Sequence, residues 1–399
     1  MLSSDTRLTI TKEKRYVGVI FFLFAVQIMS WVPRFPEIKT NLALSNGEFG
    51  TYLSLGSVGA VVAMLSSGHL VQKYGSRRVL VLSSFTMCVA IATITHLQSA
   101  TLFIILNMIN GAAISAFNIA INAQAFHAQD RAGEMIISKQ HGYWTIGALT
   151  TAIVSGVLVD VVSITRHISI LSVTLFVAIC YFVSKLGPEL IKPSENEKDD
   201  FRILDLLTSF RLDVLVASAF ACAIIVEFVT ADWSAIYTKE TVGVSGSLAT
   251  IPYIASLIAM IIGRLGIHIV TRRVPLESMV KIGSVVGGVG FIGFITASNL
   301  LVDFSTTASF ICAVLGFAIG GLGSSFLSPT LFTAANARSP QHSAIVVGQM
   351  GVVNAILILI IKTIIAWTAQ FTGSIAIALI IPGLMLIAVA FMSRVAKGI

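Results

Sequence analysis

Long apolar segments alternate with short polar ones along almost the whole chain, beginning near Tyr16. A helix crosses the hydrocarbon core of a membrane with about 20 apolar residues, and twelve segments are long enough. They lie at residues 16–36, 47–71, 78–96, 101–126, 138–161, 167–186, 212–238, 246–270, 275–297, 301–334, 341–368 and 372–393. The pattern predicts an all-α membrane protein with twelve transmembrane helices.

One polar segment is much longer than the others. Residues 187–211 contain Pro188, Pro193 and a dense cluster of charges, which are typical of a solvated linker. This linker divides the predicted spans six and six, into an N-terminal half at 1–186 and a C-terminal half at 212–399.

The two halves also repeat one another at a nearly constant separation. The matched residues are Trp31 and Trp233, Ser45 and Ser245, Gly68 and Gly266, Ser115 and Ser325, and Arg131 and Arg338. Repeated halves usually place a binding site at their interface, near the middle of the membrane.

The basic residues indicate the topology of the chain in the membrane. With alternating spans, 20 of the 26 Lys and Arg residues fall on the side of the two termini, and four fall on the other side. Because cytoplasmic loops are enriched in Lys and Arg, both termini and the 187–211 linker are predicted to be cytoplasmic.

Composition agrees with a polytopic membrane protein and excludes several other classes. Hydrophobic residues make up 56% of the chain and charged residues 11%, against about 25% charged in a soluble domain. The net charge of +7 lies in short loops, so no nucleic-acid partner is expected. The four cysteines lie in apolar segments, and neither metal-ligand spacing nor a P-loop occurs. We therefore expect no cofactor, no metal and no enzymatic activity.

The segment from Ala219 to Tyr237 places an acid, Glu227, near the middle of a predicted span. A charged carboxylate there costs about 2.5–3.5 kcal/mol on insertion scales, and such groups usually mark ion or solute paths. Glu227 is therefore the candidate proton carrier, and the alternative is a group that only joins neighbouring helices. Thr230, on the same segment, is placed among the candidate solute-binding residues. Asp232 lies nearer the outer end and is expected to pair with Arg34 or Lys239 as a gate or brace.

A polar stripe marks the fourth predicted span. Its residues recur every three or four positions and so share one helical face; they are Asn107, Gly111, Ser115, Asn118 and Asn122. The stripe is predicted to line a solute path, with interhelical hydrogen bonding as the alternative. Gln27 belongs to a smaller stripe in the first span, which also contains Arg34. In the tenth span, small residues from Gly316 lead to Pro329, where a helix break is expected.

The loop after the second span reads GHLVQKYGSRRVL, from Gly68 to Leu80. This loop resembles the signature G-x-L-x-D-R-x-G-R-R/K of the major facilitator superfamily, although Gln72 replaces its aspartate. Gating roles are implied by this resemblance for four of its residues, Gly68, Gly75, Arg77 and Arg78. The segments 31–39, 117–125, 141–147 and 227–237 resemble the fucose-permease-like branch, which includes rhizopine-associated members.

The resemblance implies a monomeric secondary transporter of the bacterial inner membrane. Its two halves would alternate access to a cavity lined by spans 1, 4, 7 and 10. A small polar solute, sugar or polyol-like, would be moved together with protons in symport. The alternatives are a proton-driven exporter of a metabolite or toxic compound, or a membrane sensor.

The predicted membrane topology leads to a testable prediction about the linker at residues 187–211. A cysteine introduced at Ser194 should resist an impermeant thiol reagent in intact cells and react after the membrane is permeabilised. Labelling of intact cells would contradict cytoplasmic termini.

Overall fold

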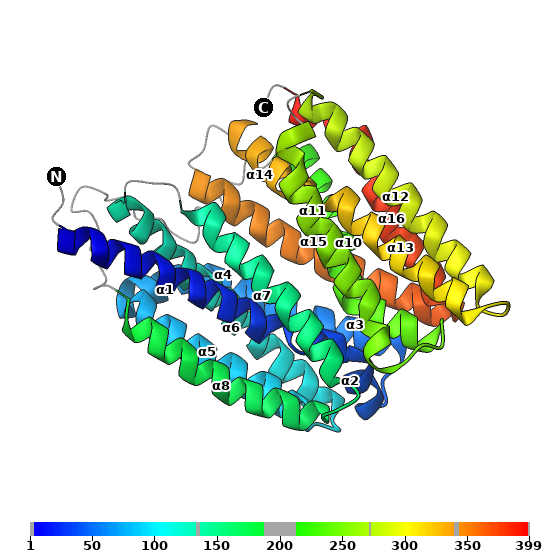
Figure 1. Ribbon diagram of the computed structural model, residues 1–399, viewed down its shortest axis with the longest axis horizontal. Helices are drawn as coiled ribbons and strands as arrows, with labels where there is room; N and C mark the ends of the chain where they lie inside the picture. Colours follow the sequence, from blue (N-terminus) through cyan, green and yellow to red (C-terminus); the bar gives the residue numbers. More distant parts are fainter. Residues whose placement is uncertain (1–3, 133–135, 187–212, 271–272, 339–342, 398–399) are drawn as a thin grey trace. The chain divides into compact units, whose positions relative to one another are not determined.

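The computed structural model describes residues 4–132, 136–186, 213–270, 273–338 and 343–397, and every regular element in these ranges is helical (Figure 1). Ten helical segments among them are long and apolar enough to cross a membrane. Helices α7 (Ile137–Leu158) and α16 (Ile375–Phe391) occupy the places of the fifth and twelfth predicted spans. The structure thereby confirms the predicted all-α membrane architecture. The 187–211 linker lies outside the described residues.

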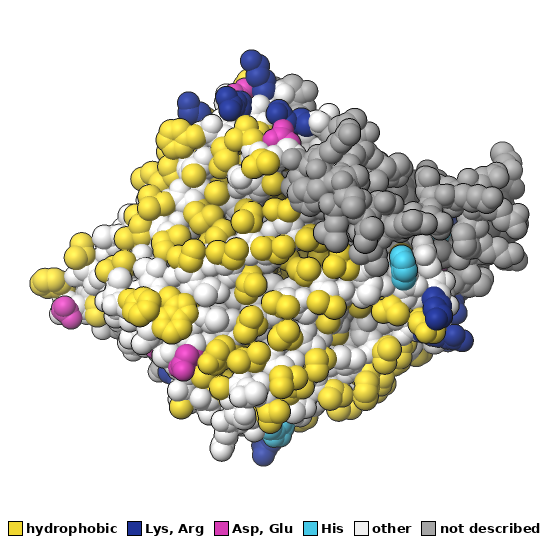
Figure 2. All heavy atoms as spheres, turned by 180° about the vertical axis from the view of Figure 1, so that it is seen from behind, with side chains coloured by type: hydrophobic (Ala, Val, Ile, Leu, Met, Phe, Trp, Pro, Cys, Tyr) yellow, Lys and Arg dark blue, Asp and Glu magenta, His cyan; other side chains and the backbone are white. Residues whose placement is uncertain are grey.

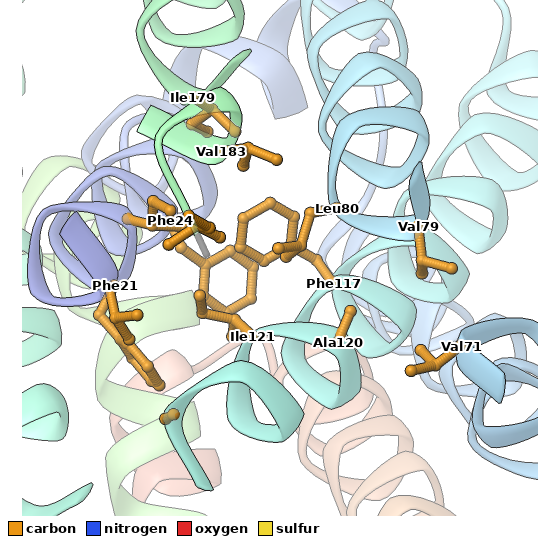
Figure 3. Packing of buried hydrophobic residues seen from close by; sticks show 14 of the residues in the cluster. Phe21, Phe24, Val71, Val79, Leu80, Phe117, Ala120, Ile121, Ile179 and Val183 are labelled. Carbon is orange, nitrogen blue, oxygen red and sulfur yellow. The ribbon is translucent and has the colours of Figure 1, made fainter. Parts of the chain in front are cut away.

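Contacts divide the chain into two compact units, and the first comprises Met1–Trp31, Leu55–Ser155 and Val161–Ile203. Its remaining helices are α1 (Ser4–Met29), α4 (Gly56–Tyr74), α5 (Ser76–Ile94), α6 (Ala100–Ala132) and α8 (Ile164–Ser184). In its core, the rings of Phe24 and Phe117 stack with their centroids 4.5 Å apart. Figure 3 shows Leu80 and Ile121 beside these two rings, so α1, α5 and α6 share one apolar core.

Glycines bring α4 and α6 of this unit into close contact. A Cβ on Gly59 would collide with the backbone carbonyl of Met108, and one on Gly111 with the carbonyl of Gly56. Small residues allow such backbone approach between helices in a membrane, where packing rather than the hydrophobic effect drives association. Gly111 of the predicted polar stripe therefore has a packing role.

The second unit comprises Val32–Ser54, Gly156–Asp160 and Leu204–Ile399. Its elements, apart from α16, are η1 (Val32–Arg34), α2 (Phe35–Asn41), α3 (Asn46–Ser54), α10 (Val214–Glu240), η2 (Gly246–Thr250), α11 (Ile251–Val270), α12 (Leu276–Leu301), α13 (Thr306–Ser324), α14 (Leu327–Arg338), α15 (Ser343–Thr372) and η3 (Ser393–Ala396).

Two segments from the first half of the sequence thus pack within this second unit. Gly50 of α3 allows the approach of α10 and α15, because a Cβ there would lie 2.9 Å from the Trp233 ring and closer still to Ala366. The side chain of Lys39 in α2 donates to Glu240 at the end of α10, at 2.6 Å from each carboxylate oxygen. Packing and an ion pair both hold residues 32–54 in place.

Apolar side chains lie on the outer surfaces of the helices. Leu82 and Val173 of the first unit are each 67% exposed, and Ile262 of the second is 60% exposed. Figure 2 shows hydrophobic side chains spread over much of one face, with Lys and Arg at its margins. Exposure of this extent fits helices that contact lipid rather than water.

The tenth span is broken, and the break lies at residues 325–326, between α13 and α14. The sequence predicted it at Pro329, which instead lies in the first turn of α14. The difference has a simple physical reason. A proline has no N–H and its ring clashes with the carbonyl four residues earlier, which here belongs to Ser325. The disruption therefore appears one turn before the proline itself.

Candidate functional site: two ion pairs on helix α10

Helix α10 is fixed at both ends by its own carboxylates. The side chain of Asp213 accepts from the backbone N–H groups of Leu215 and Val216, at 3.0 and 3.3 Å, and so caps the first turn. Its other oxygen accepts from Arg338 at 2.8 Å, which joins the start of α10 to the end of α14. With the Lys39–Glu240 pair at the far end, α10 is a firmly positioned helix.

The first ion pair lies at the middle of α10. Nη2 of Arg264, in α11, is 3.4 Å from Oε2 of Glu227. The two side chains are 34% and 18% exposed. Oε1 of Glu227 is buried and has no hydrogen-bond partner within the described residues. The carboxylate is therefore held loosely, on one oxygen only.

A backbone carbonyl holds the other side of Arg264. Its Nε donates to the carbonyl oxygen of Ser325 at 2.8 Å, at the break between α13 and α14. In a continuous helix that carbonyl would accept from the N–H of residue 329, but Pro329 has none. An unsatisfied carbonyl is costly inside a membrane, and the guanidinium satisfies it. Gly263 allows the approach, because a Cβ there would collide with the Ser325 side chain.

The second ion pair lies one and a half turns further along α10 and is tighter. Nζ of Lys362, in α15, is 2.5 Å from Oδ2 of Asp232, and the side chains are 9% and 10% exposed. The Lys362 ammonium also lies 5.9 Å from the centroid of the Phe228 ring, within the range of a cation–π contact. Both side chains are almost fully buried, so the pair is suited to bracing α10 against α15.

The predicted partners of Asp232, Arg34 or Lys239, are wrong. Asp232 pairs with Lys362, a charge inside the eleventh predicted span. Arg34 is fully buried and donates from Nε to Glu37 at 2.5 Å and from Nη2 to the Val159 carbonyl at 3.5 Å. Arg34 therefore ties residues 156–160 to α2.

The candidate solute-binding residues lie in different surroundings. Thr230 is buried within α10. The amide nitrogen of Gln27 donates to the Ser84 carbonyl at 3.0 Å and to Cys88 Sγ at 2.9 Å, so it joins α1 to α5. A solute would have to replace both bonds in order to reach this amide.

The stripe on α6 divides into two parts. Asn107 and Ser115 are buried, and Asn107 lies against Gly56 of α4. Asn118 is exposed, and Asn122 is half-buried, with its amide nitrogen 3.0 Å from Oδ1 of Asn118. Only the Asn118–Asn122 part presents amide groups away from the helix packing, within the first unit.

The candidate gating residues around the α4–α5 turn are mostly accessible. Gly75 has a φ of 85°, a conformation that L side chains rarely adopt, and it connects the two helices directly. Arg77 is half-buried and Arg78 is exposed in the first turn of α5. Gly68 is exposed on α4, and a Cβ there would meet nothing within 4 Å.

The sequence interpretation missed Arg264, Lys362 and the Ser325 carbonyl as parts of the site. A signal for the first two was present, because both are charged residues inside predicted spans, as Glu227 is. The role of the Ser325 carbonyl can be inferred only when the position of the helix break is known. That position lies four residues before Pro329, because Pro329 cannot donate a hydrogen bond to the carbonyl there.

Comparison with known proteins identifies the family. The sequence profile described as Major Facilitator Superfamily matches residues 17–361, which is most of the chain. The chain belongs to the Major Facilitator Superfamily. This confirms the resemblance to the superfamily that was inferred from the loop after the second span. The rhizopine-associated branch was inferred from four other segments, and a rhizobial membrane protein is among the relatives described next.

Two relatives of this superfamily member are similar over most of their length. An uncharacterized MFS-type transporter of Yersinia pestis is 24% identical over 376 residues, covering 94% of this chain and 93% of the relative. Membrane protein MosC of Rhizobium meliloti is 25% identical over 329 residues, covering 82% of this chain and 76% of that protein.

Solved structures show the same fold. The nucleoside transporter NupG, in a mutant form, has a TM-score of 0.76 at 16% identity, covering 96% of this chain and 99% of that one. A D-xylose-proton symporter has a TM-score of 0.69 at 14% identity, covering 99% and 98%. This member of the superfamily therefore shares the fold of these two transporters.

The buried Asp232–Lys362 pair generates a prediction about stability. Asp232→Asn should destabilise the protein by about 3–5 kcal/mol, because it leaves a buried ammonium without its counter-charge. The double variant Asp232→Asn/Lys362→Met should recover most of that loss. Thermal unfolding in detergent measures both, and additive losses in the double variant would contradict the bracing role.

The helix break generates a second prediction. Pro329→Ala supplies an N–H that can bond to the Ser325 carbonyl, so Arg264 loses its acceptor and transport should slow at least roughly tenfold in folded protein. Pro382→Ala is the matched control, because Pro382 also lies inside an apolar helix, α16. Equal transport rates for both variants in proteoliposomes would show that the carbonyl contact has no role.

Proposed function

We propose that this protein is a secondary transporter of the bacterial inner membrane that moves a small polar solute together with protons. The observation that carries the proposal is the Glu227–Arg264 pair at the middle of α10. It combines a partly accessible carboxylate, one oxygen without a hydrogen-bond partner in the described residues, and a long contact to its counter-ion.

The geometry supports a proton carrier at Glu227. A proton on Oε1 needs no existing hydrogen bond to be broken, and it removes the attraction between Glu227 and Arg264. Arg264 remains attached to the Ser325 carbonyl, at the break of the tenth span. Discontinuous helices commonly form coupling sites in secondary transporters. One protonation event would thus release α10 from α11, while α11 stays attached to the break between α13 and α14.

Solute recognition is assigned to the accessible amides of Asn118 and Asn122, which can donate to and accept from hydroxyl groups. A proton-coupled symporter of a sugar occurs among the proteins with this fold, because the D-xylose-proton symporter is one by its name. The direction proposed here is uptake. A proton-driven exporter would use the same Glu227–Arg264 pair. The direction of solute flux under an imposed pH gradient distinguishes uptake from export.

Gating is assigned to polar contacts at one end of the second unit. Lys39 binds Glu240 there, and Arg34 binds Glu37 and Val159. Asp160 accepts from the backbone N–H of Ser247 at 2.8 Å, and this hydrogen bond holds the pKa of Asp160 below its usual value. These contacts join residues 32–54 and 156–160 to α10 and η2, and opening this end would break them.

The proposed function predicts the behaviour of Glu227→Gln. The amide keeps much of the shape of the carboxyl but cannot change protonation. The variant should exchange solute across proteoliposome membranes yet fail to accumulate it under an imposed pH gradient, and its rate should lose its pH dependence. Glu277→Gln, at the start of α12, is the matched control and should still accumulate solute. Gradient-driven accumulation by Glu227→Gln would place the proton site elsewhere.

A further inference from the structure

We infer that the transported solute carries a carboxylate, and that the Arg264 guanidinium binds it when Glu227 is protonated. The inference rests on the proposed function and names the chemical class of its solute: a small hydroxylated monocarboxylic acid, such as a sugar acid, rather than a neutral sugar.

The hydrogen bonds of Arg264 leave part of its guanidinium for a ligand. Nε is engaged by the Ser325 carbonyl at 2.8 Å, which fixes the plane of the group. Nη2 is 3.4 Å from Glu227, longer than the roughly 2.7–2.9 Å of a charge-assisted hydrogen bond. The edge formed by Nη1 and Nη2 has the fork geometry that binds a carboxylate through two parallel bonds.

Accessibility distinguishes Arg264 from the other cation inside the second unit. The Arg264 side chain is 34% exposed, whereas the Lys362 side chain is 9% exposed and sits 2.5 Å from Asp232. Both lie in helices that are long and apolar enough to cross the membrane. A ligand can reach Arg264 without displacing a tightly bound partner, and it cannot reach Lys362 in that way.

Charge balance then selects an anion. In the empty carrier, Glu227 and Arg264 together have no net charge. Protonation of Glu227 leaves Arg264 as an uncompensated cation inside a membrane span, which is costly. A neutral sugar would leave that charge in place, whereas a monocarboxylate would cancel it. The empty site and the site loaded with one proton and one monoanion are then both neutral, so either can change conformation without an exposed charge.

The other carboxylates of α10 and its N-cap do not supply the compensation. Asp232, which is also on α10, forms an ion pair with Lys362 of α15. Asp213 forms an ion pair with Arg338 at the start of α10. Glu240 binds Lys39 at the other end of α10. Among the described carboxylates of α10 and its N-cap, Glu227 is the one paired with Arg264. When Glu227 is protonated, the positive charge of Arg264 is therefore compensated only if an anion binds.

The test is thermal unfolding of the full-length protein in detergent with a panel of probes. The panel pairs sugar acids and hydroxy acids with neutral compounds of the same carbon chain, for example gluconate with sorbitol and glucose. We expect carboxylates alone to raise the unfolding temperature of the parent protein. Glu227→Gln mimics the protonated carboxyl, and it should bind the stabilising carboxylate at least roughly tenfold more tightly than the parent.

Variants of the cation complete the test. Arg264→Gln should lose the carboxylate effect, and Arg264→Lys should bind at least roughly tenfold more weakly, because an ammonium cannot make the bidentate contact. Asp232→Asn is the matched control. It also leaves a cation without its counter-ion, but a buried one, so carboxylates should stabilise it no more than they stabilise the parent. If Glu227→Gln does not fold, the difference in carboxylate binding between the parent protein and Arg264→Lys still tests the inference.

Several outcomes would overturn the inference. They are stabilisation by neutral members of the panel, retention of carboxylate binding in Arg264→Gln, or no carboxylate effect on the parent or Glu227→Gln. Flux in proteoliposomes separates this failure from failure of the proposed function. Accumulation of a neutral sugar with protons refutes only the carboxylate, whereas a complete lack of response to a pH gradient refutes the proton-coupled transporter.

Discussion

A charge inside a membrane span needs an opposite charge beside it, and this constraint organises the second unit. Helix α10 places two carboxylates in its interior, and α11 and α15 each supply a cation. The two pairs satisfy the constraint to different degrees. Asp232 and Lys362 are close and buried, which favours a permanent brace. Glu227 and Arg264 are further apart and partly exposed, which favours a pair that opens during transport.

The looser pair depends on a backbone defect. Pro329 cannot donate to the Ser325 carbonyl, and a carbonyl without a donor is costly in a membrane. Arg264 supplies that donor, and the same guanidinium then reaches Glu227. A single proline is thereby connected to the proposed proton carrier through two contacts. This connection gives the broken tenth span a chemical role as well as a packing role.

Much of the fold could be predicted, because apolar segments of sufficient length specify helices that cross a membrane. The turn at Gly75 was also predictable, because a glycine between two apolar segments permits the positive φ of a tight turn, and the structure has a φ of 85° there. The contacts between helices that are distant in the sequence could not be predicted. Periodicity put Asn107 and Asn118 on one face of α6, but it could not show that one is buried against α4 and the other exposed. The partner of Asp232 was missed for the same reason, since Lys362 lies four spans later.

Glu227 is proposed to exchange its contact with Arg264 for a proton when solute binds, and this exchange can be measured as proton uptake from the solution. Purified protein in weakly buffered detergent solution would be mixed with a sugar acid that stabilises it, while a pH indicator follows the solution. We expect the parent protein to take up close to one proton per bound solute and Glu227→Gln to take up none. Binding without proton uptake by the parent, or equal uptake by both proteins, would contradict it.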